Sequence, residues 1–577
     1  MGVIIGIDLG TTNSEVAVIK DNVPKVIPVD GELIMPSCVG VDKNGGLIVG
    51  RAAKNQMISD PESTVLSIKR KMGRDTTVRL GKRRLTPEEI SSFILKKLKS
   101  EAEAFLGEKV EQAVITVPAY FDDSQRKATR NAGILAGLDV TRVLNEPTAA
   151  ALAYDGNLED NETILVYDLG GGTFDVSLVT VENGVVEVRA SHGDTQLGGD
   201  DFDDLLIEHI AGIFREQHET DLLGDLRSRN RLWSAVEMAK RELSDAPYAS
   251  IKEEFIHGDH HLDLEISRMD YEDMIKPLLK KTLDSLHQCL KDGDLLPGDI
   301  DKILLVGGAT RTPLVSQIIR HEIGIESIHS INPDLIVAIG AAVQAGVIGG
   351  METHSVLVDI TPYTFGTSAV GPHNGKLCPD IFVPIISRNT ALPVRNGEAF
   401  ATMNDGQEAV DVRIYQGEEP LATDNIFIGN FLIEGLGDVP AGNEIILNLQ
   451  LDLNGILEVT ALEKRTGLSK TVRMDTKKQK QAFDLEKARE NILALAGDDD
   501  AGDLPGSSEV DKKEALLSAA KSLRKRAEAL MVDIDETDAS ELDSLIKESR
   551  RAISERAFEK IAELNESLSD MLFYLED

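Results

Sequence analysis

The sequence contains little cysteine and comparatively few positive charges. Its 577 residues include three cysteines, Cys38, Cys289 and Cys378, and no two of them form a Cys-x-x-Cys pair. This spacing is typical of a reducing compartment and argues against structural disulfides or a cysteine zinc site. Lysine and arginine number 61 against 98 aspartates and glutamates, which gives a formal net charge of −37. Nucleic acid and anionic membrane surfaces would repel such a chain, so we expect neither as a partner.

Long hydrophobic runs are also missing. The longest uncharged stretch, Leu335 to Met351, is shorter than the roughly 20 residues of a membrane span and contains Gln344. It therefore predicts a helix buried against a sheet. The first residues lead directly into a predicted strand, without the basic and apolar segments of a signal peptide. We expect a cytoplasmic protein.

Several familiar catalytic motifs are absent. The sequence has no Gly-x-x-x-x-Gly-Lys-Ser/Thr, no Gly-x-Gly-x-x-Gly, no His-Glu-x-x-His and no recognisable nucleophile setting. His257, His260 and His261 could ligate a metal, but they flank Gly258-Asp259 in a predicted hairpin tip. That position favours exposed turn histidines over a metal site.

One pattern occurs twice. The segments are Asp8-Leu-Gly10-Thr-Thr-Asn13 and Asp168-Leu-Gly170-Gly-Gly-Thr173, each between two apolar strands. Glycine permits a tight turn, whose amides and hydroxyls can bind phosphate, and a carboxylate at its mouth suits a hydrated Mg²⁺. Either copy alone is equally compatible with an ordinary tight hairpin. Two copies in matched register favour a clamp on a polyphosphate.

A third glycine-rich turn follows the predicted buried strand Lys302–Val306. It runs Val306-Gly307-Gly308-Ala-Thr-Arg311, where bare backbone and a guanidinium could receive a base or ribose. Alone it is a loop that contains glycine. Together with the two hairpins it completes a nucleotide site.

The length and the element pattern predict three or four domains. Strands and helices alternate up to about residue 350, with a buried strand at 112–117 and a capped helix that starts at Thr86-Pro87-Glu88-Glu89. A β domain then follows. Its evidence is a strand at 409–415 after the turn 404–406, alternating leucines at 447, 449, 451 and 453, and a hairpin turn at Asn454-Gly455.

The remaining hundred residues are predicted to be helical. One helix is expected at 483–496, and 497–508 reads as an acidic flexible linker. Two apolar stripes then predict a small helical bundle: Leu516, Ala520, Leu523, Ala527, Leu530, and Ile561, Leu564, Leu568, Met571, Leu575. A coiled-coil dimer is the alternative, but the runs are too short for it, so we expect a monomer.

Longer strings resemble one family. The three turns are similar to those of the actin, sugar kinase and heat-shock ATPase superfamily, and four further segments resemble the seventy-kilodalton heat-shock chaperones of the DnaK type. These segments are Ala113–Phe121, Asn145–Ala151, Gly193–Phe202 and Asn332–Val343. The resemblance covers nearly the whole chain and is weakest over the last hundred residues. It implies an α/β actin-like ATPase domain of two duplicated lobes (1–352), a linker (353–361), a β-sandwich substrate domain (362–475) and a helical lid (476–577) with an acidic break at 497–508.

The resemblance also implies roles for residues of the ATP site. Asp8 and Asp168 would hold Mg²⁺ through water, and Lys69, Glu146, Asp168 and Thr173 would form the catalytic group around the attacking water. ATP or ADP would be held by Gly10, Thr11, Thr12, Asn13, Gly171, Gly172, Thr173, Glu237, Lys240, Ser244, Gly308 and Arg311. The spacing 237/240/244 places three of these on one helix face. From sequence alone, Lys69 and Glu146 could equally form an ordinary ion pair.

The β domain would bind an extended apolar peptide. The matching positions are Thr367, Val370, Phe400, Met403, Val410 and Val412, which could also be plain core residues. Coupling between the two sites would run through Val356, Leu357, Val358 and Asp359 of the linker and through Arg126, Arg130, Arg142 and Asn454. Arg142 matches a position used by J-domain partners.

The chain departs from the family pattern at several points. The segment between Arg74 and Leu85 is short, which predicts that one subdomain of the ATPase domain is trimmed. The hairpin after Ser250 is also short, which argues against a GrpE-like exchange factor. Gly371–Ile386 reads as a long loop that carries Cys378. Asn454 replaces an aspartate expected to pair with Arg126 and Arg130, which predicts weaker docking in the ATP state. The C-terminal tail lacks Glu-Glu-Val-Asp.

We therefore expect an ATP-hydrolysing chaperone that binds and releases apolar segments of unfolded polypeptides. A J-domain partner and a GrpE-like exchange factor are expected with it. One alternative is a nucleotide-binding adaptor that holds peptide with weak domain coupling, and another is a small-molecule kinase of the same superfamily. The sequence does not identify clients or particular partners.

Overall fold

The computed structural model describes most of the chain. The described residues are 2–154, 161–182, 184–328, 332–351, 356–437, 439–473, 484–496 and 536–555, with Ala520, Arg524, Ala527, Lys560, Ile561 and Leu564. The chain divides into two compact units, Met1–Leu495 and Ala496–Asp577. Among the described helices, none has both the length and the apolar character needed to cross a lipid bilayer.

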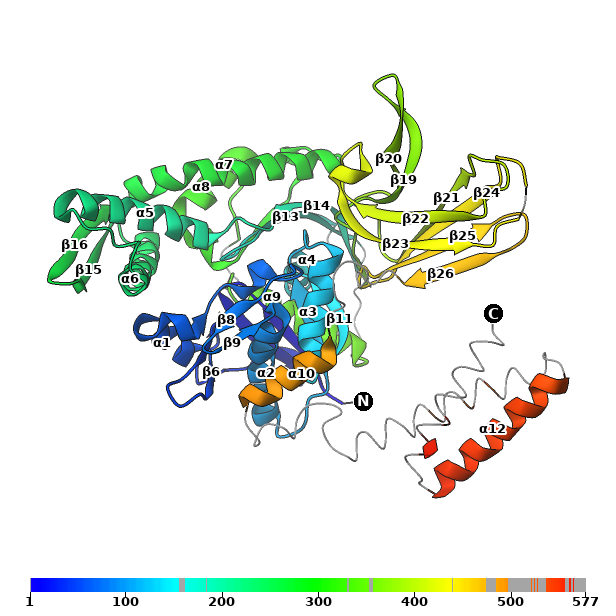
Figure 1. Ribbon diagram of the computed structural model, residues 1–577. Coiled ribbons are helices and arrows are strands. Elements are labelled where there is room, and N and C mark those ends of the chain that lie inside the picture. The colour runs from blue at the N-terminus through cyan, green and yellow to red at the C-terminus, as the bar shows by residue number, and fades with distance from the viewer. Residues whose placement is uncertain are drawn as a thin grey trace. The chain divides into compact units, whose positions relative to one another are not determined.

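Two sheets of related topology form the first part of the larger unit (Figure 1). The first has the order β11-β10-β1-β2-β3, with β4 paired to β2, and the second has the order β17-β12-β13-β14-β18. Each contains an antiparallel hairpin, β1–β2 or β12–β13, and a parallel strand beside its first strand, β10 or β17. The bounds of the first sheet are β1 (Ile4–Leu9), β2 (Asn13–Lys20), β3 (Val23–Val26), β4 (Met35–Pro36), β10 (Gln112–Val117) and β11 (Asp139–Asn145). Those of the second are β12 (Glu162–Leu169), β13 (Phe174–Glu182), β14 (Val185–Asp194), β17 (Lys302–Val306) and β18 (Val356–Val358).

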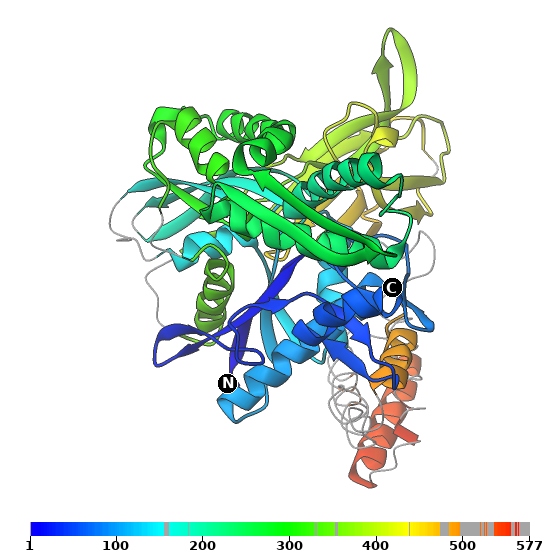
Figure 2. The same ribbon diagram turned by 90° about the vertical axis from the view of Figure 1, so that its left-hand side faces the viewer.

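Two helices pack between these sheets, α4 (Glu146–Ala153) and α9 (Ile336–Ile348) (Figures 1 and 2). Their close approach depends on glycine. A Cβ on Gly340 would lie 1.7 Å from the Ala149 carbonyl oxygen, and one on Gly6 of β1 would lie 2.1 Å from the Ala342 nitrogen. The buried helix predicted within 335–351 is confirmed.

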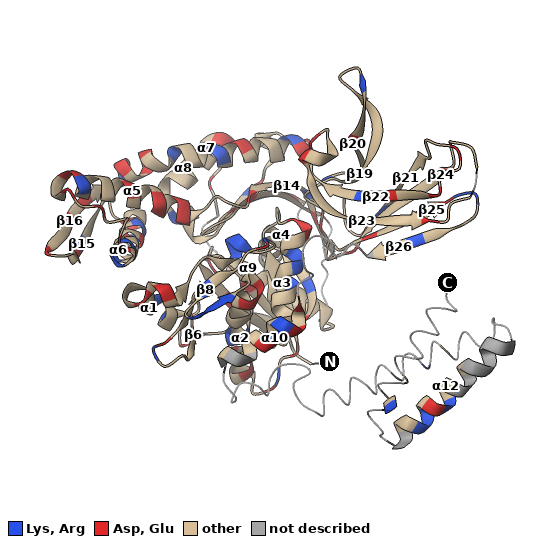
Figure 3. Ribbon diagram, in the orientation of Figure 1, with Lys and Arg blue, Asp and Glu red and all other residues tan. Residues whose placement is uncertain are grey.

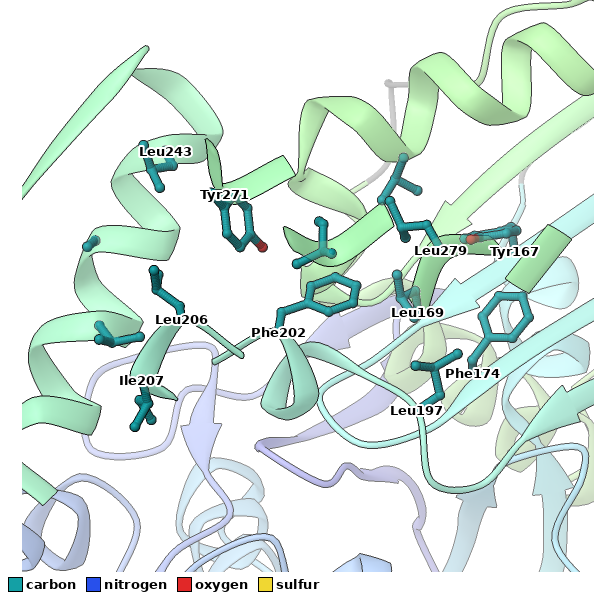
Figure 4. Packing of buried hydrophobic residues seen from close by; sticks show 14 of the residues in the cluster. Tyr167, Leu169, Phe174, Leu197, Phe202, Leu206, Ile207, Leu243, Tyr271 and Leu279 are labelled. Atoms are coloured by element: carbon teal, nitrogen blue, oxygen red, sulfur yellow. The ribbon is translucent and has the colours of Figure 1, made fainter. Parts of the chain in front are cut away.

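Four helices share one hydrophobic core with the second sheet: α5 (Gly199–His218), α6 (Leu226–Asp245), α7 (Arg268–Asp292) and α8 (Pro313–Ile323). Of these, α7 lies against β13 and β14, and α6 packs on α5 and β15 (Tyr248–His257). Figure 4 shows their core, in which Phe202 points toward Leu169 and Leu279. Tyr167 and Phe174 pack with ring centroids 4.7 Å apart, and the Tyr167 hydroxyl donates to Thr282 Oγ1 at 2.6 Å. Acidic and basic residues are interspersed along the solvent side of α7 (Figure 3), as expected for a helix with one apolar face.

The first sheet carries α1 (Arg51–Ser59), α2 (Pro87–Leu106) and α3 (Asp123–Leu135). The predicted start of α2 is confirmed: Thr86 Oγ1 accepts from the Glu89 amide, and the Glu89 carboxylate accepts from the Thr86 amide. The histidine hairpin is also confirmed. β15 ends at His257, β16 begins at His260, and Gly258 at the tip has φ +58°. The remaining short strands are β5 (Val39–Val41), β6 (Leu47–Val49), β7 (Thr64–Val65), β8 (Val78–Leu80), β9 (Arg83–Leu85), β15 (Tyr248–His257) and β16 (His260–Ser267).

Two four-stranded sheets over one shared core form the β domain. Leu447, Leu449 and Leu451 are buried as predicted, whereas Leu453 lies beyond the strand and is exposed. One order is β20-β19-β22-β23 and the other β21-β24-β25-β26. The bounds are β19 (Phe365–His373), β20 (Lys376–Ile386), β21 (Val394–Ala401), β22 (Ala409–Gln416), β23 (Ile426–Glu434), β24 (Glu444–Leu451), β25 (Leu457–Glu463) and β26 (Ser469–Arg473).

The interpretation of Gly371–Ile386 as a loop is wrong. The segment continues β19 into a hairpin with β20, closed by Asn374 and Gly375, whose φ angles are +50° and +77°. Cross-strand bonds therefore extend to the pair His373–Lys376, and Cys378 lies in a strand.

The last helices are described in part. α10 (Leu485–Ala496) lies within the predicted 483–496, and α12 (Glu536–Glu555) belongs to the second unit. Ala520, Ala552, Ile561 and Leu564 share one buried cluster in that unit, as a small bundle requires. The other members of the two predicted stripes (Leu516, Leu523, Leu530, Leu568, Met571 and Leu575) and the acidic break at 497–508 lie outside the described residues.

Candidate nucleotide site

The two glycine-rich turns face each other at close range. A Cβ on Gly171 would lie 1.7 Å from Thr12 Oγ1, and a Cβ on Gly172 would lie 2.6 Å from Thr11 Cγ2. Any side chain at either position would push the two turns apart. The arrangement follows from their places in the two sheets, since each turn closes the antiparallel hairpin at the centre of its own sheet. The convergence predicted from the repeated pattern is therefore present.

Charged side chains gather beneath these turns. Asp8 accepts a hydrogen bond from Thr116 Oγ1 at 2.8 Å, and Lys69 Nζ lies 2.5 Å from Glu146 Oε1. Asp168 and both members of the Lys69–Glu146 pair are buried. Lys69 also lies 5.8 Å from the centre of the Phe121 ring. The four predicted acidic and basic groups therefore share one centre.

The electrostatics of this centre favour an added cation. Burial raises the pKa of Asp8 and of Asp168, and it raises the pKa of Glu146 to about 7 despite the attraction of Lys69. Burial alone would lower the pKa of Lys69, but the neighbouring carboxylates, Glu146 foremost, outweigh it and raise that pKa. Carboxylates thus outnumber the lysine, which suits a hydrated divalent cation. In the described part of the chain, no three acidic, histidine or cysteine side chains form a direct metal cage.

A cavity of about 800 Å³ opens beside the turns. Eight of the predicted nucleotide residues line it: Thr12, Asn13, Gly171, Glu237, Lys240, Ser244, Gly308 and Arg311. The other four, Gly10, Thr11, Gly172 and Thr173, belong to the same two turns without lining the cavity. One concave space therefore contains residues from all three glycine-rich segments and from α6.

Ion pairs hold the polar side chains of the cavity wall in place. Glu237 on α6 bonds Lys54 of α1 at 2.7 Å, which joins the two lobes across the mouth. Lys240 bonds Asp203 at 2.6 Å, and Arg311 bonds Asp334 at 2.5 Å. Because these pairs fix the donors and acceptors in advance, a ligand would not have to order them.

Several residues of the site were not expected from the sequence. Lys54, Thr116 and Glu15 lack any motif, and they reach the site only through tertiary packing. Asp200 accepts from Thr12 at 3.3 Å and from Ser67 at 2.7 Å. Glu15 does show one local feature, because it is a charged residue directly before the apolar run Val16–Ile19 of β2.

The six predicted peptide residues do not all reach the surface. Val412 is part of the β-domain core, and Thr367 is buried with its hydroxyl donating to the Arg413 carbonyl at 2.7 Å. Phe400 and Val410 pack against the same core. Val370 and Met403 are exposed, by 44% and 60%. Their shared role stays a prediction.

The predicted linker residues lie on the second sheet. Val356, Leu357 and Val358 form β18, which pairs in parallel with β14. Asp359 is buried, and its carboxylate accepts from Asn145 Nδ2 at 2.9 Å and from Thr148 Oγ1 at 3.4 Å.

Two predicted arginines lie close to this carboxylate. Arg126 donates to Asn145 Oδ1 at 2.6 Å. Arg142 is buried, and its Nε and Nη2 have no hydrogen-bond partner within the described residues. Asp359 acts electrostatically on both guanidinium groups.

Asn454 contacts the backbone of the first sheet. Asn454 Oδ1 accepts from the backbone N–H of Val143 at 3.2 Å and pairs with neither Arg126 nor Arg130. An aspartate could accept the same bond. The weaker docking expected from the missing charge at 454 stays a prediction.

Further contacts join the β domain and α10 to the first part of the chain. Arg388 bonds Asp292 at the end of α7 at 2.7 Å. The Tyr363 hydroxyl donates to the Tyr120 carbonyl at 2.9 Å. Asn491 of α10 donates to Glu89 of α2 at 2.7 Å.

Comparison with known proteins decides the family. The family model described as "Hsp70 protein" matches residues 4–575. The chain belongs to the Hsp70 family. It is 42% identical over 580 aligned residues to the "Chaperone protein DnaK" of Thermotoga neapolitana, which covers 98% of this chain and 95% of that protein. The protein of the same name from Thermotoga maritima gives the same identity and coverage.

Membership in the Hsp70 family establishes the general activity of the chain. This Hsp70 protein is an ATP-dependent chaperone that hydrolyses ATP and binds unfolded polypeptides. The same matches exclude the alternative of a small-molecule kinase. The individual roles of the site residues remain predictions.

Proposed function

We propose that this Hsp70 chain binds MgATP between its two facing turns and uses hydrolysis to switch a peptide site in the β domain between fast and slow exchange. The domains would be an actin-like ATPase domain of two lobes (1–352), a linker (353–361), a β-sandwich substrate domain (362–475) and a helical lid (476–577). The observation that carries the proposal is that the turns of Asp8 and Asp168 meet at one cavity.

At the ATP site, Asp8 and Asp168 hold Mg²⁺ through its water shell. Gly10 to Asn13 and Gly171 to Thr173 hold the phosphates, while Lys69, Glu146 and Thr173 orient the attacking water. Glu237, Lys240, Ser244, Gly308 and Arg311 enclose adenosine. Phosphoryl transfer to water needs positioning and charge neutralisation, and the preformed ion pairs of the cavity wall supply positioning.

The linker strand provides a physical route for coupling. β18 is the edge strand of the same sheet that carries the Asp168 turn, two strands away through β14 and β13. A change at that turn would alter the sheet to which β18 is paired. When β18 is paired, the β domain contacts the first part of the chain through Tyr363 on Tyr120 and Arg388 on Asp292. The coupling free energy between two such sites is typically about 1–3 kcal/mol.

In the β domain, an extended apolar segment would bind near Val370 and Met403, with Thr367, Phe400, Val410 and Val412 supporting them. A J-domain partner would engage near Arg142, and a GrpE-like factor would promote nucleotide exchange. We place this activity in the cytoplasm and expect a monomer.

The decisive experiment measures the dissociation rate of a fluorescent apolar peptide with ATP and with ADP, in wild type and Lys69→Ala. Release should be faster with ATP in both proteins, whereas the slow state should form from ATP only in the wild type. Equal release rates with ATP and ADP in the wild type would instead favour a holding adaptor. Peptide stimulation of ATP turnover gives a second, independent readout.

A further inference from the structure

Glu15 is a buried carboxylate that none of the assignments above uses. It lies on β2 directly opposite Asp8 on β1, as Cα partners of the antiparallel hairpin. Directly opposed residues on neighbouring antiparallel strands point to the same face of the sheet, with Cβ atoms about 5 Å apart. Glu15 therefore faces the same side as Asp8, and it is 2% exposed.

The immediate surroundings do not satisfy this carboxylate. Asp8 accepts a hydrogen bond from Thr116, but no hydrogen bond to the Glu15 side chain occurs in the described part of the chain. The charges that act on it are mostly of its own sign: Asp8, Asp334 and Glu146. The lysine that acts on it, Lys69, is already paired with Glu146 at 2.5 Å.

A purely structural role would not explain this arrangement. The Glu15 oxygens are not among the fully enclosed polar atoms that lack a partner, so they reach solvent at least in part. The cost of this position comes from the like charges in the same pocket. The neighbours of Glu15 along β2, Ser14 and Val16, are fully buried, so an apolar or small side chain would fit the strand at less cost. A hydrated cation beside Asp8 would reverse the sign of the interaction and give the carboxylate water donors.

We propose that Glu15 is a positioning residue of the magnesium nucleotide centre, where it acts with Asp8 on the water shell of the cation and increases the affinity for Mg²⁺. This inference rests on the proposed function. The residue does not line the nucleotide cavity, and its contribution is the charge that it would present to the hydrated metal. Groups of this kind commonly change metal affinity by about 10- to 100-fold when they are removed.

The test is a magnesium titration of full-length wild type, Glu15→Gln and Glu88→Gln at a fixed ADP concentration, followed by the midpoint of thermal unfolding. Glu88→Gln is the matched control, because Glu88 on α2 is also a buried glutamate with a raised pKa but has no contact with the site. The Mg²⁺ concentration at half-maximal stabilisation should rise about tenfold in Glu15→Gln and stay unchanged in Glu88→Gln. Calorimetry with ADP and EDTA should show that Glu15→Gln binds metal-free ADP no more weakly than wild type.

Glu15→Asp keeps the charge, and it provides a second measurement in case Glu15→Gln does not fold. Its half-maximal Mg²⁺ concentration should remain within about threefold of wild type. The inference would be overturned if the half-maximal Mg²⁺ concentration were unchanged in Glu15→Gln. It would also be overturned if that concentration rose equally in Glu15→Asp and Glu15→Gln. Absence of any Mg²⁺-dependent stabilisation in the wild type would refute the proposed nucleotide site itself, which is a distinguishable result.

Discussion

The Lys69–Glu146 pair shows how one contact can be both structural and chemical. Both side chains are almost completely buried, 5% and 9% exposed, at a centre where carboxylates are in excess. An ion pair placed for stability alone would not need to lie beside Asp8 and between two phosphate-type turns. The position favours a cation that neutralises the transferring phosphoryl group and steers the attacking water.

Lys69→Ala should therefore lower the single-turnover rate of ATP hydrolysis by about 100-fold or more, because a preorganised charge is lost at the transition state. The affinity for MgATP should change much less, since the turns and α6 provide most of the binding contacts. Lys276→Ala, which removes an exposed pair with Asp273, is the control and should leave the rate unchanged. A variant with normal hydrolysis would contradict the assignment.

The buried carboxyl group of Asp203 predicts how the stability of the protein depends on pH. Burial raises its pKa to about 6, and Lys240 offsets this only in part. The folded protein then binds the proton more tightly than the unfolded chain, whose value is near 3.8, so this residue reduces stability as the pH rises from about 4 to 6. In that pH range the free energy of unfolding can fall by at most roughly 1.4 kcal/mol per pH unit through this residue.

Relative to wild type, Asp203→Asn should become progressively more stable between pH 4 and 6, with a constant difference at higher pH. Thermal unfolding midpoints at fixed salt measure this. Asp221→Asn should behave oppositely, because the Arg215 bond lowers the pKa of exposed Asp221 and wild type loses that contribution on acidification. If the unfolding midpoints of Asp203→Asn and wild type changed in parallel with pH, Asp203 would not titrate between pH 4 and 6.

At the residue scale, the sequence predicted those members of the site that have a local signal. The turns at Gly10 and Gly171 are recognisable because only small residues permit their backbone path. Lys54 and Thr116 carry no such signal, since their partners Glu237 and Asp8 are distant in the chain. The contact of Asn454 with a backbone N–H of β11 also has no local signal, since the two residues are distant in the chain.

At the level of elements, the packing of α4 against α9 depends on a single missing side chain. Gly340 lies where its Cα faces the backbone of Ala149, and an added methyl would overlap the carbonyl oxygen. Both helices belong to the core between the two sheets, so their separation sets the spacing of the lobes.

Gly340→Ala should lower the thermal midpoint markedly and reduce ATP turnover, because the helices must move apart. Gly212→Ala in α5 is a matched helical change with no heavy atom within 4 Å of the new methyl. It should stabilise the protein by about 0.5–1 kcal/mol through helix propensity and chain entropy. A similar loss in both variants would refute the steric explanation.

Elements with strong local signals were predicted well, and one with mixed signals was not. The α2 cap follows from Thr86 and Glu89 alone, a complete local motif. The β19–β20 hairpin was taken for a loop from the resemblance to the family, and Gly371, Pro372 and Pro379 give the segment no clear strand pattern of its own. The pairing persists through a register shift between Ala369 and Gly371, which only the two strands together can specify.

For the larger unit as a whole, the β domain and the linker before it contact both earlier sheets and α7 at several specific points. β18 joins the sheet edge, Asp359 is buried beside Asn145, and Arg388 reaches Asp292. The Arg388–Asp292 pair is one of these contacts, and its partly buried charges can contribute a measurable share of the coupling free energy. A single charge reversal should therefore be measurable.

Arg388→Glu should reduce the acceleration of peptide release by ATP by about fivefold to 30-fold, which corresponds to roughly 1–2 kcal/mol of coupling. The side chains are 28% and 10% exposed, so the pair is only partly screened by solvent. Arg388→Glu combined with Asp292→Arg should restore most of the acceleration, because the pair is rebuilt with opposite polarity. Arg395→Glu, an exposed change on β21, controls for the altered net charge. If the double variant were no better than Arg388→Glu alone, the loss would come from local disruption of the β domain and the ion pair would carry no coupling.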